Sequence, residues 1–427
     1  MASRSWLGCD DSSSGPGGST DGGDAAGPPL DVGVGGDAGA DATSPPDGGP
    51  PDAGPAERTY FPARTLPARP ALRSRIADIG PLGDPDENGL RLPAGFRSRV
   101  IARSMQVVPG TSHAWHILPD GGATYITEDG GWIYVSNSEM VLNMGGVGAV
   151  RFDSSANVVA AYAILEGTNA NCAGGPTPWH TWLSCEETGI GRVHECDPWG
   201  EHEAVARPAL GVFKHEAAAI DPVRAHVYMT EDEGDGCFYR FVPSARTPDG
   251  HPDLHAGALE VAVVDATGAV TWRALPDPQS TGDAPTRDQV PESTAFDGGE
   301  GIWYHDGVVY FSTKGDNRVW RYDVEEARLT ILYDGDAMAD PPLRGVDNLT
   351  VSCCGDVLVA EDGGSMQVVA ILPGGEARPL VQVIGHEGSE ITGPAFDPSG
   401  TRLYFSSQRS SDGGTTFEIE GPFHEPI

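Results

Sequence analysis

One plan of short strands and turns recurs six times along this chain, and it constrains the fold more than any other feature. The clearest copy is HEAAAIDPVRAHVYMTEDEGDGCFYRFVP (215–243), in which EAAAID, HVYMTE and CFYRFV are strands separated by turns containing Gly, Asp or Pro. Helical periodicity is almost absent. The six copies span residues 121–153, 174–197, 215–243, 299–323, 346–372 and 390–423.

The spacing of the copies predicts an all-β fold, a six-bladed β-propeller. The copies follow one another at steps of roughly 45 to 50 residues, except for one step of about 80 that carries a polar, Pro-rich insertion near residues 245–292. A period in this range with three or four short strands per unit is typical of propellers. A β-sandwich also uses short strands and Gly-rich turns, but it does not predict six similar units.

The beginning of the chain differs in composition from the rest. No Lys or Arg occurs between Arg4 and Arg58, while ten acids lie there among Gly, Pro, Ala and Ser. Such a segment cannot bury enough apolar surface to offset the entropy lost on ordering. Residues 10–57 are therefore predicted to be a disordered Asp/Gly/Pro-rich linker, followed by a propeller domain at 58–427.

A motif similar to the end of a lipoprotein signal, Leu7-Gly8-Cys9, precedes this linker. We expect residues 1–9 to be the remnant of such a signal and the protein to be secreted or held at the cell envelope. The membrane contact would be a lipid anchor at Cys9. No run of about 18 apolar residues occurs elsewhere in the sequence.

The formal net charge of −35 limits the classes of partner. A field of this sign disfavours nucleic acid and anionic membrane surfaces. It is compatible with bound divalent cations, although a solvated acidic surface explains the charge equally well. We expect a small-molecule substrate, no nucleic-acid partner and a monomeric chain.

Acidic residues recur at equivalent places in the copies. In a propeller blade the first strand lines the channel and the second returns antiparallel to it, so the start of one and the end of the other lie at the same mouth. The residues at these places are Glu216 with Glu231, Glu300 with Lys314, Asp347 with Glu361, Glu390 with Gln408, Asn137 with Glu139, and Cys185 with Glu186 and Glu187. The sequence thus predicts a cluster of carboxylates and one thiol at one mouth.

Cations must compensate such a cluster, because crowded carboxylates raise one another's pKa. Calcium takes six to eight oxygen ligands, whereas a thiolate suits a softer ion such as iron or zinc. We therefore expect Cys185 to bind a transition metal, with Glu186 or Glu187 sharing it or bridging to calcium. A strand cysteine can instead be a small buried apolar residue, and a single glutamate can be a solvated turn residue.

The other cysteines define no further site by their spacing. The chain has no CxxC pair, which excludes an ordinary zinc knuckle, and Cys353 and Cys354 are neighbours. An oxidising compartment would permit a bridge from Cys172 or Cys185 to Cys196, but the sequence does not assign one.

Several segments resemble the PhoX-type alkaline phosphatases and their shorter relatives. They are NCAGGPTPWHTWLSCEE, FKHEAAAIDP, VYMTEDEGDGCFYRFVP, DNLTV with VLVAEDGG, and TGPAFDPSGTRLYFSSQ with TFEIEGPF. The resemblance implies a six-bladed propeller, secretion, and phosphoester hydrolysis at a cluster of calcium and iron ions, with the cysteine of the CEE motif bound to iron. Carried over by motif, that cysteine is Cys185, and the acidic ligands are Glu186, Glu187, Glu216, Glu231, Glu300, Asp347 and Glu361; Glu139 joins them from its place in the first copy.

One departure from the resemblance concerns a phosphate-contacting cation. The phosphatases have an arginine shortly before a glutamate in an Arg-Pro-Glu type motif, where this chain reads Asp297-Gly298-Gly299-Glu300. Arginine binds phosphate oxygens in a bidentate manner, and its loss commonly raises the reaction barrier by several kcal/mol. Lys314 or Arg409 would supply the charge instead, and Glu300 would assist proton transfer or metal binding.

Together these patterns predict a metal-dependent phosphoester hydrolase that uses calcium and iron. Two alternatives remain open. Calcium-bearing six-bladed propellers include lactonases and phosphotriesterases, and the DN of VDNLTV with its downstream VAED is similar to those enzymes as well. A tethered, calcium-stabilised propeller that binds a partner at the envelope without catalysis is the other.

Overall fold

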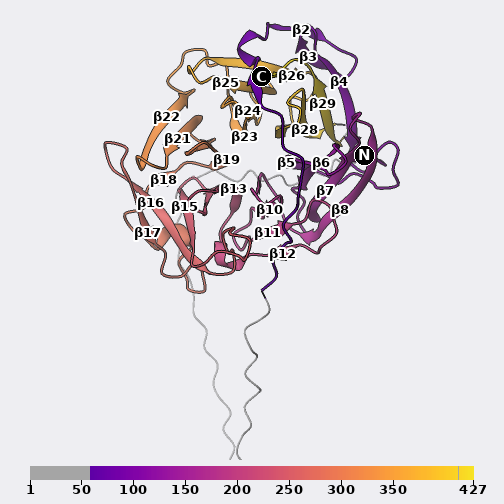
Figure 1. Ribbon diagram of the computed structural model, residues 1–427. Helices are drawn as coiled ribbons and strands as arrows, with labels where there is room; N and C mark the ends of the chain where they lie inside the picture. Colours follow the sequence, from indigo (N-terminus) through magenta and orange to yellow (C-terminus); the bar gives the residue numbers. More distant parts are fainter. Residues whose placement is uncertain (1–57, 412) are drawn as a thin grey trace, which may run out of the picture. The chain divides into compact units, whose positions relative to one another are not determined.

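Six antiparallel sheets surround a common centre in the computed structural model of this protein, which describes residues 58–411 and 413–427 (Figure 1). The prediction of an all-β, six-bladed propeller is confirmed for this part of the chain. The predicted signal remnant (1–9) and linker (10–57) lie outside the described residues. Within the described residues no helix is long and apolar enough to cross a membrane.

Each blade is a sheet whose strands follow one another outward from the centre (Figure 1). Blades 1 to 3 contain β5 (Pro119–Ile126), β6 (Trp132–Ser138), β7 (Gly145–Phe152) and β8 (Val158–Thr168); β9 (Gly175–Pro176), β10 (Trp182–Cys185), β11 (Val193–Cys196) and β12 (Val205–Ala206); and β13 (His215–Asp221), β14 (His226–Glu231), β15 (Gly236–Pro243), β16 (Gly257–Val264) and β17 (Val270–Ala274), with β18 (Ala295–Phe296) paired to β15.

The remaining blades include strands from both ends of the described chain. Blades 4 to 6 contain β19 (Gly299–His305), β20 (Val308–Thr313), β21 (Arg318–Asp323) and β22 (Arg328–Asp334); β23 (Val346–Val351), β24 (Val357–Glu361), β25 (Gln367–Ile371) and β26 (Ala377–Val383), extended by β3 (Leu90–Pro93) and β2 (Leu82–Pro85); and β27 (Ile391–Phe396), β28 (Arg402–Ser410), β29 (Gly413–Glu420) and β4 (Arg97–Arg103). Short 3₁₀ helices occur at Ile76–Asp78, Pro208–Leu210 and Thr286–Asp288.

The inner and middle strands are buried on both faces because each blade packs between two neighbours. In β14, Val227 and Met229 point to a core cluster shared with Leu183 of blade 2. Tyr228, between them in sequence, points the other way and packs in a cluster with Phe311 of blade 4. Successive strand residues face opposite sides, so the run VYM supplies apolar contacts to both interfaces.

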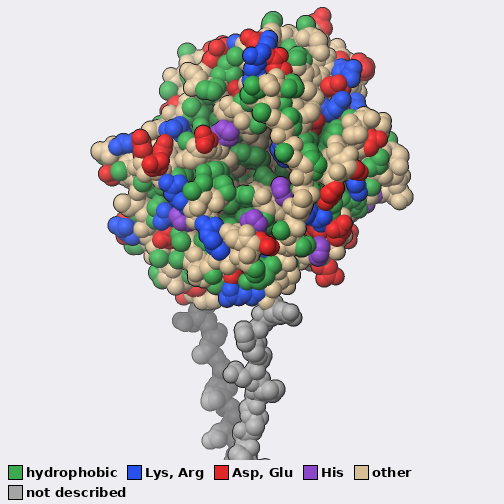
Figure 2. Space-filling model, in the orientation of Figure 1, with side chains coloured by type: hydrophobic (Ala, Val, Ile, Leu, Met, Phe, Trp, Pro, Cys, Tyr) green, Lys and Arg blue, Asp and Glu red, His purple; other side chains and the backbone are tan. Residues whose placement is uncertain are grey.

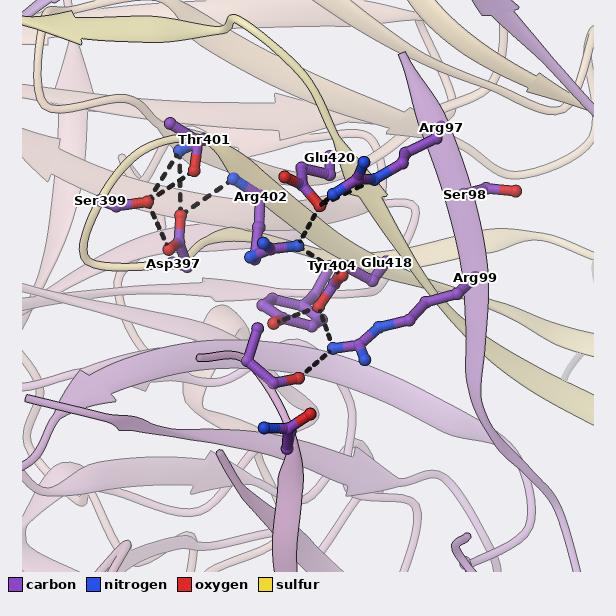
Figure 3. Close-up of polar contacts among 12 residues, drawn as sticks. Arg97, Ser98, Arg99, Asp397, Ser399, Thr401, Arg402, Tyr404, Glu418 and Glu420 are labelled. Carbon is purple, nitrogen blue, oxygen red and sulfur yellow. Dashed lines mark hydrogen bonds and ion pairs between the residues drawn. The ribbon is translucent and has the colours of Figure 1, made fainter. Parts of the chain in front are cut away.

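The ring closes by pairing a strand from near the start of the described chain with the C-terminal blade. β4 pairs antiparallel with β29, the third strand of blade 6. Arginines of β4 reach acids of β29 (Figure 3): Arg99 lies 2.8 Å from Glu418, and Arg97 lies 2.5 Å from Glu420. Arg402 of β28 joins both acids at 2.9 and 2.6 Å, so the closing seam is an ion-pair network.

The inner strands approach one another closely along the channel. A Cβ atom on Gly121 would lie 1.7 Å from the carbonyl oxygen of Ala173, and one on Gly301 would lie 2.3 Å from the backbone nitrogen of Leu349. Only glycine permits such contacts. A cavity of about 10 Å³ lies between these strands, so the backbone separates the two mouths of the channel.

Candidate metal centre

A β-bulge at the start of the inner strand places an acidic side chain at the same mouth of four blades. In blade 3, Glu216 and Ala217 together oppose the single residue Thr230 of β14. The same two-to-one pairing carries the acids of blades 1, 4 and 5, which are Asp120, Glu300 and Asp347. Bulges re-aim side chains and are common next to functional sites. We call this end of the channel the acidic mouth.

Cys172 holds the equivalent place in blade 2. Asn171 bridges to Glu186 across the blade, and Cys172 follows it at the position that Glu216 holds in blade 3. The backbone N–H of Cys172 donates to the carbonyl oxygen of Cys185 at 2.9 Å. One blade therefore presents a thiol where four others present carboxylates.

Among the described residues, possible ligand atoms at the acidic mouth form at least three groups, each with all atoms within 4.8 Å of one another. The groups are Asp120, Glu139 and Glu390; Glu139, Cys172 and Glu187; and Glu216, Glu300 and Asp347. Glu139 belongs to two groups, so these adjoin. Two groups offer oxygen alone, as hard cations prefer, and one adds a sulfur that suits a softer ion.

Burial raises the pKa of these carboxyl groups, because the ionised form loses its water. Asp120 and Glu216 are each 1% exposed. Burial first, and then a neighbouring carboxylate, raise the pKa of both well above the usual range. Burial likewise raises the pKa of Asp347 to about 6. Bound cations would favour the ionised forms, so the oxygen groups fit metal ions.

The thiol of Cys172 is buried beside these acids. Burial, and next the charge of Asp120, raise the pKa of Cys172 well above its ordinary value. The protonated sulfur donates to Oδ2 of Asp120 across 3.7 Å. A metal cation would displace this proton, because the thiolate is the form that binds metals.

Two cationic side chains, those of Lys314 and Arg409, lie beside the buried acids and are partly exposed to solvent. The Nζ atom of Lys314 lies 2.7 Å from Glu300 and 2.9 Å from Asp232. Arg409 lies 2.8 Å from Glu390. The Lys314 and Arg409 side chains are 39% and 38% exposed. Burial acts to lower the pKa of both cations, but the adjacent carboxylates raise it by more than burial lowers it. The pKa of each cation is therefore raised, and both remain charged.

The structure brings five of the nine predicted metal ligands into the three groups. They are Glu139, Glu187, Glu216, Glu300 and Asp347. The predicted cations Lys314 and Arg409 lie beside them, as just described. Cys185, Glu186, Glu231 and Glu361 do not belong to these groups, and their contacts explain why.

Glu186, Glu231 and Glu361 face the turn that follows the second strand of their own blade. The carboxylate of Glu361 accepts hydrogen bonds from the backbone N–H groups of Arg344, Ser365 and Gln367 at 2.8, 2.9 and 3.0 Å.

Glu231 accepts from the N–H of Cys237 and the hydroxyl of Tyr239, and it pairs with Arg287 at 3.1 Å. Glu186 accepts from the N–H groups of Asn169 and Arg192. Each of the three braces a turn.

The next residue in each of these blades lies toward the acidic mouth instead. Glu187 lies in one group with Cys172, and Asp232 forms an ion pair with Lys314. Burial is the largest cause of the raised pKa of Asp347, and the charge of Asp362 is the next. Because side chains alternate along a strand, a shift of one residue exchanges the two faces. The hairpin argument considered the end of the strand, and in the structure neighbouring residues at that end face opposite sides.

Cys185 packs in the apolar core between blades 2 and 3. It is fully buried with Leu183, Val193 and Phe213, and burial raises the pKa of its thiol. The sequence left open that a strand cysteine is a small buried apolar residue rather than a metal ligand. The surroundings of Cys185 fit that alternative. The sulfur beside the carboxylates is that of Cys172.

The predicted metal ligands do not include Asp120, Cys172 or Glu390, although Glu390 is among the acids that the sequence predicts at the mouth. A signal for the first two is present: when the starts of the inner strands are aligned by blade, Asp120, Cys172, Glu216, Glu300 and Asp347 fall in one column. The bulges that make this column significant are not visible without the strand register. The amide of Gln408 connects two acids of one group, since it donates at 2.7 Å to both Asp120 and Glu139.

Comparison with known protein families identifies the chain. The family described as "Alkaline phosphatase PhoX" matches residues 133–197 and 189–411. The chain belongs to the PhoX family of alkaline phosphatases. The resemblance drawn from the motifs is thereby confirmed.

One similar solved structure is itself a PhoX protein. The chain is similar to Pseudomonas fluorescens PhoX in complex with vanadate, a transition state analogue, with 18% identity and a TM-score of 0.65, over 80% of this chain and 97% of that one. A gluconolactonase from Xanthomonas campestris shares 14% identity with a TM-score of 0.44, over 86% and 99% of the two chains. A search of curated protein sequences finds no match.

Gly298, where the motif resemblance leads us to expect an arginine, lies against Lys314. Its φ of +68° is in the left-handed region that favours glycine. A Cβ atom there would lie 3.0 Å from Cγ of Lys314 and 3.3 Å from Oδ1 of Asp232. Lys314 therefore lies next to the space that a side chain at position 298 would enter.

Proposed function

We propose that this PhoX-family protein hydrolyses phosphate esters at a metal centre in the acidic mouth. The observation that carries the proposal is the set of three groups of buried acids, one of which includes a thiol, in a family of alkaline phosphatases. Calcium suits the two all-oxygen groups. Iron suits the group of Glu139, Cys172 and Glu187, because of its sulfur.

When bound, such cations would polarise the phosphoryl group and neutralise its charge. The chain's own residues then bind and orient the substrate. Lys314 and Arg409 are positively charged, partly exposed and fixed by ion pairs to Glu300 and Glu390. They are placed to donate hydrogen bonds to phosphate oxygens above the buried acids, and Lys314 takes the role of the absent arginine.

Glu300 has a second role in this proposal. It is 2% exposed and ion-paired to Lys314. Glu300 therefore holds the lysine head group in place. Burial raises the pKa of the Glu300 carboxyl group well above the usual range. Because Glu300 also belongs to one of the groups that would bind metal, proton transfer to a leaving group and metal binding are alternative roles for it, and proton transfer needs the protonated form.

The test is phosphate release from a generic phosphomonoester by the full chain, loaded with calcium and iron, with and without a calcium chelator. Chelator-sensitive turnover is expected. A folded, metal-loaded protein that releases no phosphate would contradict the proposal. A lactone panel run on the same sample would then separate the lactonase alternative from a non-catalytic propeller.

The envelope location predicted from Cys9 belongs to the same proposal, and cell fractionation tests it.

A further inference from the structure

The opposite end of the channel forms a second, chemically different cavity. Its volume is about 360 Å³, and it is lined by the far ends of the inner strands, including Tyr125, Ile220 and Val351, together with Cys353 and His424. Figure 2 shows the face crossed by the indigo segment of Figure 1, hollowed near its centre and lined there with hydrophobic side chains. We call this end the apolar mouth. It shares none of the acids of the metal groups described above.

Two thiols and an imidazole meet at the edge of this cavity. The sulfurs of Cys353 and Cys354 are 3.5 Å apart, and one ring nitrogen of His424 lies within 4.8 Å of both. The cysteines belong to the turn between β23 and β24. His424 opens β30 (His424–Pro426), which pairs with β1 (Leu72–Ser74). Segments distant in sequence therefore supply the three atoms.

The imidazole of His424 has one nitrogen bonded and one without a partner. Nδ1 donates to the carbonyl oxygen of Gly400 at 2.8 Å, which leaves the lone pair on Nε2. Nε2 is buried and has no hydrogen-bond partner, and the residue is 3% exposed. An unsatisfied buried nitrogen destabilises the folded chain. A histidine that donates one N–H to a backbone carbonyl is also the usual arrangement of a metal ligand.

The turn that carries the thiols is fixed before any ligand binds. The hydroxyl oxygen of Ser352 accepts the backbone N–H groups of Cys354 and Asp356, each at 3.1 Å, and donates to the Asp356 carboxylate at 2.8 Å. The S–H of Cys354 donates to the carbonyl oxygen of Leu72 at 3.3 Å. Cys353 is exposed, so an ion can reach the sulfurs from solvent.

We propose that Cys353, Cys354 and His424 form a zinc site at the apolar mouth. Two thiolates and an imidazole are ligands that zinc prefers, and three protein ligands leave a fourth position for water or a small ligand. Zn–S bonds of about 2.3 Å and Zn–N bonds of about 2.0 Å place ligand atoms about 3.5 to 4 Å apart in a tetrahedron. The observed sulfur separation of 3.5 Å matches this. Binding releases the two thiol protons.

The zinc site would tie the C-terminal strand β30 to blade 5. The ion would therefore stabilise the folded chain by mass action. This expectation gives a readout that is independent of phosphatase activity and of the acidic mouth.

The test uses the full chain, first reduced and freed of metal with a chelator and then loaded with calcium and iron, so that the groups at the acidic mouth are occupied before zinc is added. Zinc is titrated while bound zinc and the thermal unfolding midpoint are measured. We expect one zinc equivalent to bind and raise the midpoint, and the double variant Cys353→Ser/Cys354→Ser to lose that equivalent. The variant Cys172→Ser, altered at the acidic mouth, should retain it. Unchanged zinc content in the double variant would overturn the proposal.

A spectroscopic measurement on the unmodified chain removes any dependence on how the variants fold. X-ray absorption at the zinc edge should show two sulfur ligands and one nitrogen ligand. A ligand shell of oxygen without sulfur would overturn the site. An intact mass two units lower after purification, with Cys353 and Cys354 bridged and no zinc uptake after reduction, would likewise overturn it and indicate a redox pair.

Discussion

The Nζ atom of Lys314 lies 2.7 Å from Oε1 of Glu300, beside the space that a side chain on Gly298 would enter. Lys314 is thus a fixed, partly exposed cation beside the buried acids. A lysine supplies the charge without the planar, two-donor geometry of arginine.

Replacing Lys314 should therefore impair catalysis. We expect Lys314→Met to lower kcat/KM by about 100-fold, the usual cost of one donor to developing charge. Lys314→Arg should retain much of the activity, because it keeps the charge. Kinetics on a phosphomonoester at fixed metal loading measure both variants. Equal kcat/KM for Lys314→Met and the unmodified protein would show that the lysine has no part in turnover.

Glu216 and Glu231 should respond differently to the same substitution, although both lie at the open end of one hairpin, where β13 begins and β14 ends. Glu216→Gln should reduce the metal content, because Glu216 lies in one of the three groups. Glu231→Gln should leave the metal content unchanged and lower the free energy of unfolding by about 1–3 kcal/mol, since it weakens the bonds from Arg287, Tyr239 and the turn. Metal analysis and urea unfolding distinguish them. Similar metal loss in both variants would contradict the assignment of faces.

Glu418 should contribute to stability through ring closure. It is 2% exposed and binds Arg99, Arg402 and Tyr404. We expect Glu418→Gln to lower the free energy of unfolding by about 1–3 kcal/mol. Glu420, the more exposed acid of the same seam, provides the control, and Glu420→Gln should cost less than about 1 kcal/mol. A larger loss for Glu420→Gln in urea unfolding would contradict this ranking.

Acid should destabilise the protein partly through His215. The ring is fully buried against Phe213, and burial lowers the pKa of His215 to about 3. Between about pH 6.5 and 3 the unfolded chain binds a proton there that the folded chain does not. The stability therefore falls as the pH falls, by about 1.4 kcal/mol per unit.

His215→Gln should remove this dependence. Free energies of unfolding measured in urea from pH 7 to pH 4.5, without metal, should fall less steeply for the variant than for the unmodified chain. Other titrating groups are common to both proteins, so the difference isolates His215. Parallel profiles would mean that the ring is protonated in the folded state.

The repeat made the fold predictable, whereas the details of the site required the strand register. Runs such as VYM in β14 carry the alternation that buries both faces, and the Gly and Asp turns mark the blade period. Ring closure by β4 was not predictable in the same way, because it depends on a pairing between residues 97–103 and 413–420.

Cys172 and Cys185 show why the site was harder to predict. Both lie in blade 2 and their backbones are hydrogen-bonded to each other. The sequence places Cys185 beside two glutamates, but a strand side chain next to another in sequence faces the opposite side. The bulges that turn the inner-strand acids to the mouth leave no mark in composition or period.

The most direct test of the account is therefore a comparison of Cys172→Ala with Cys185→Ala in the full chain, measuring bound iron and phosphate release together. The account predicts that Cys172→Ala loses both iron and turnover, while Cys185→Ala keeps both and loses only stability. Loss of iron from Cys185→Ala with iron retained in Cys172→Ala would contradict the proposed metal centre.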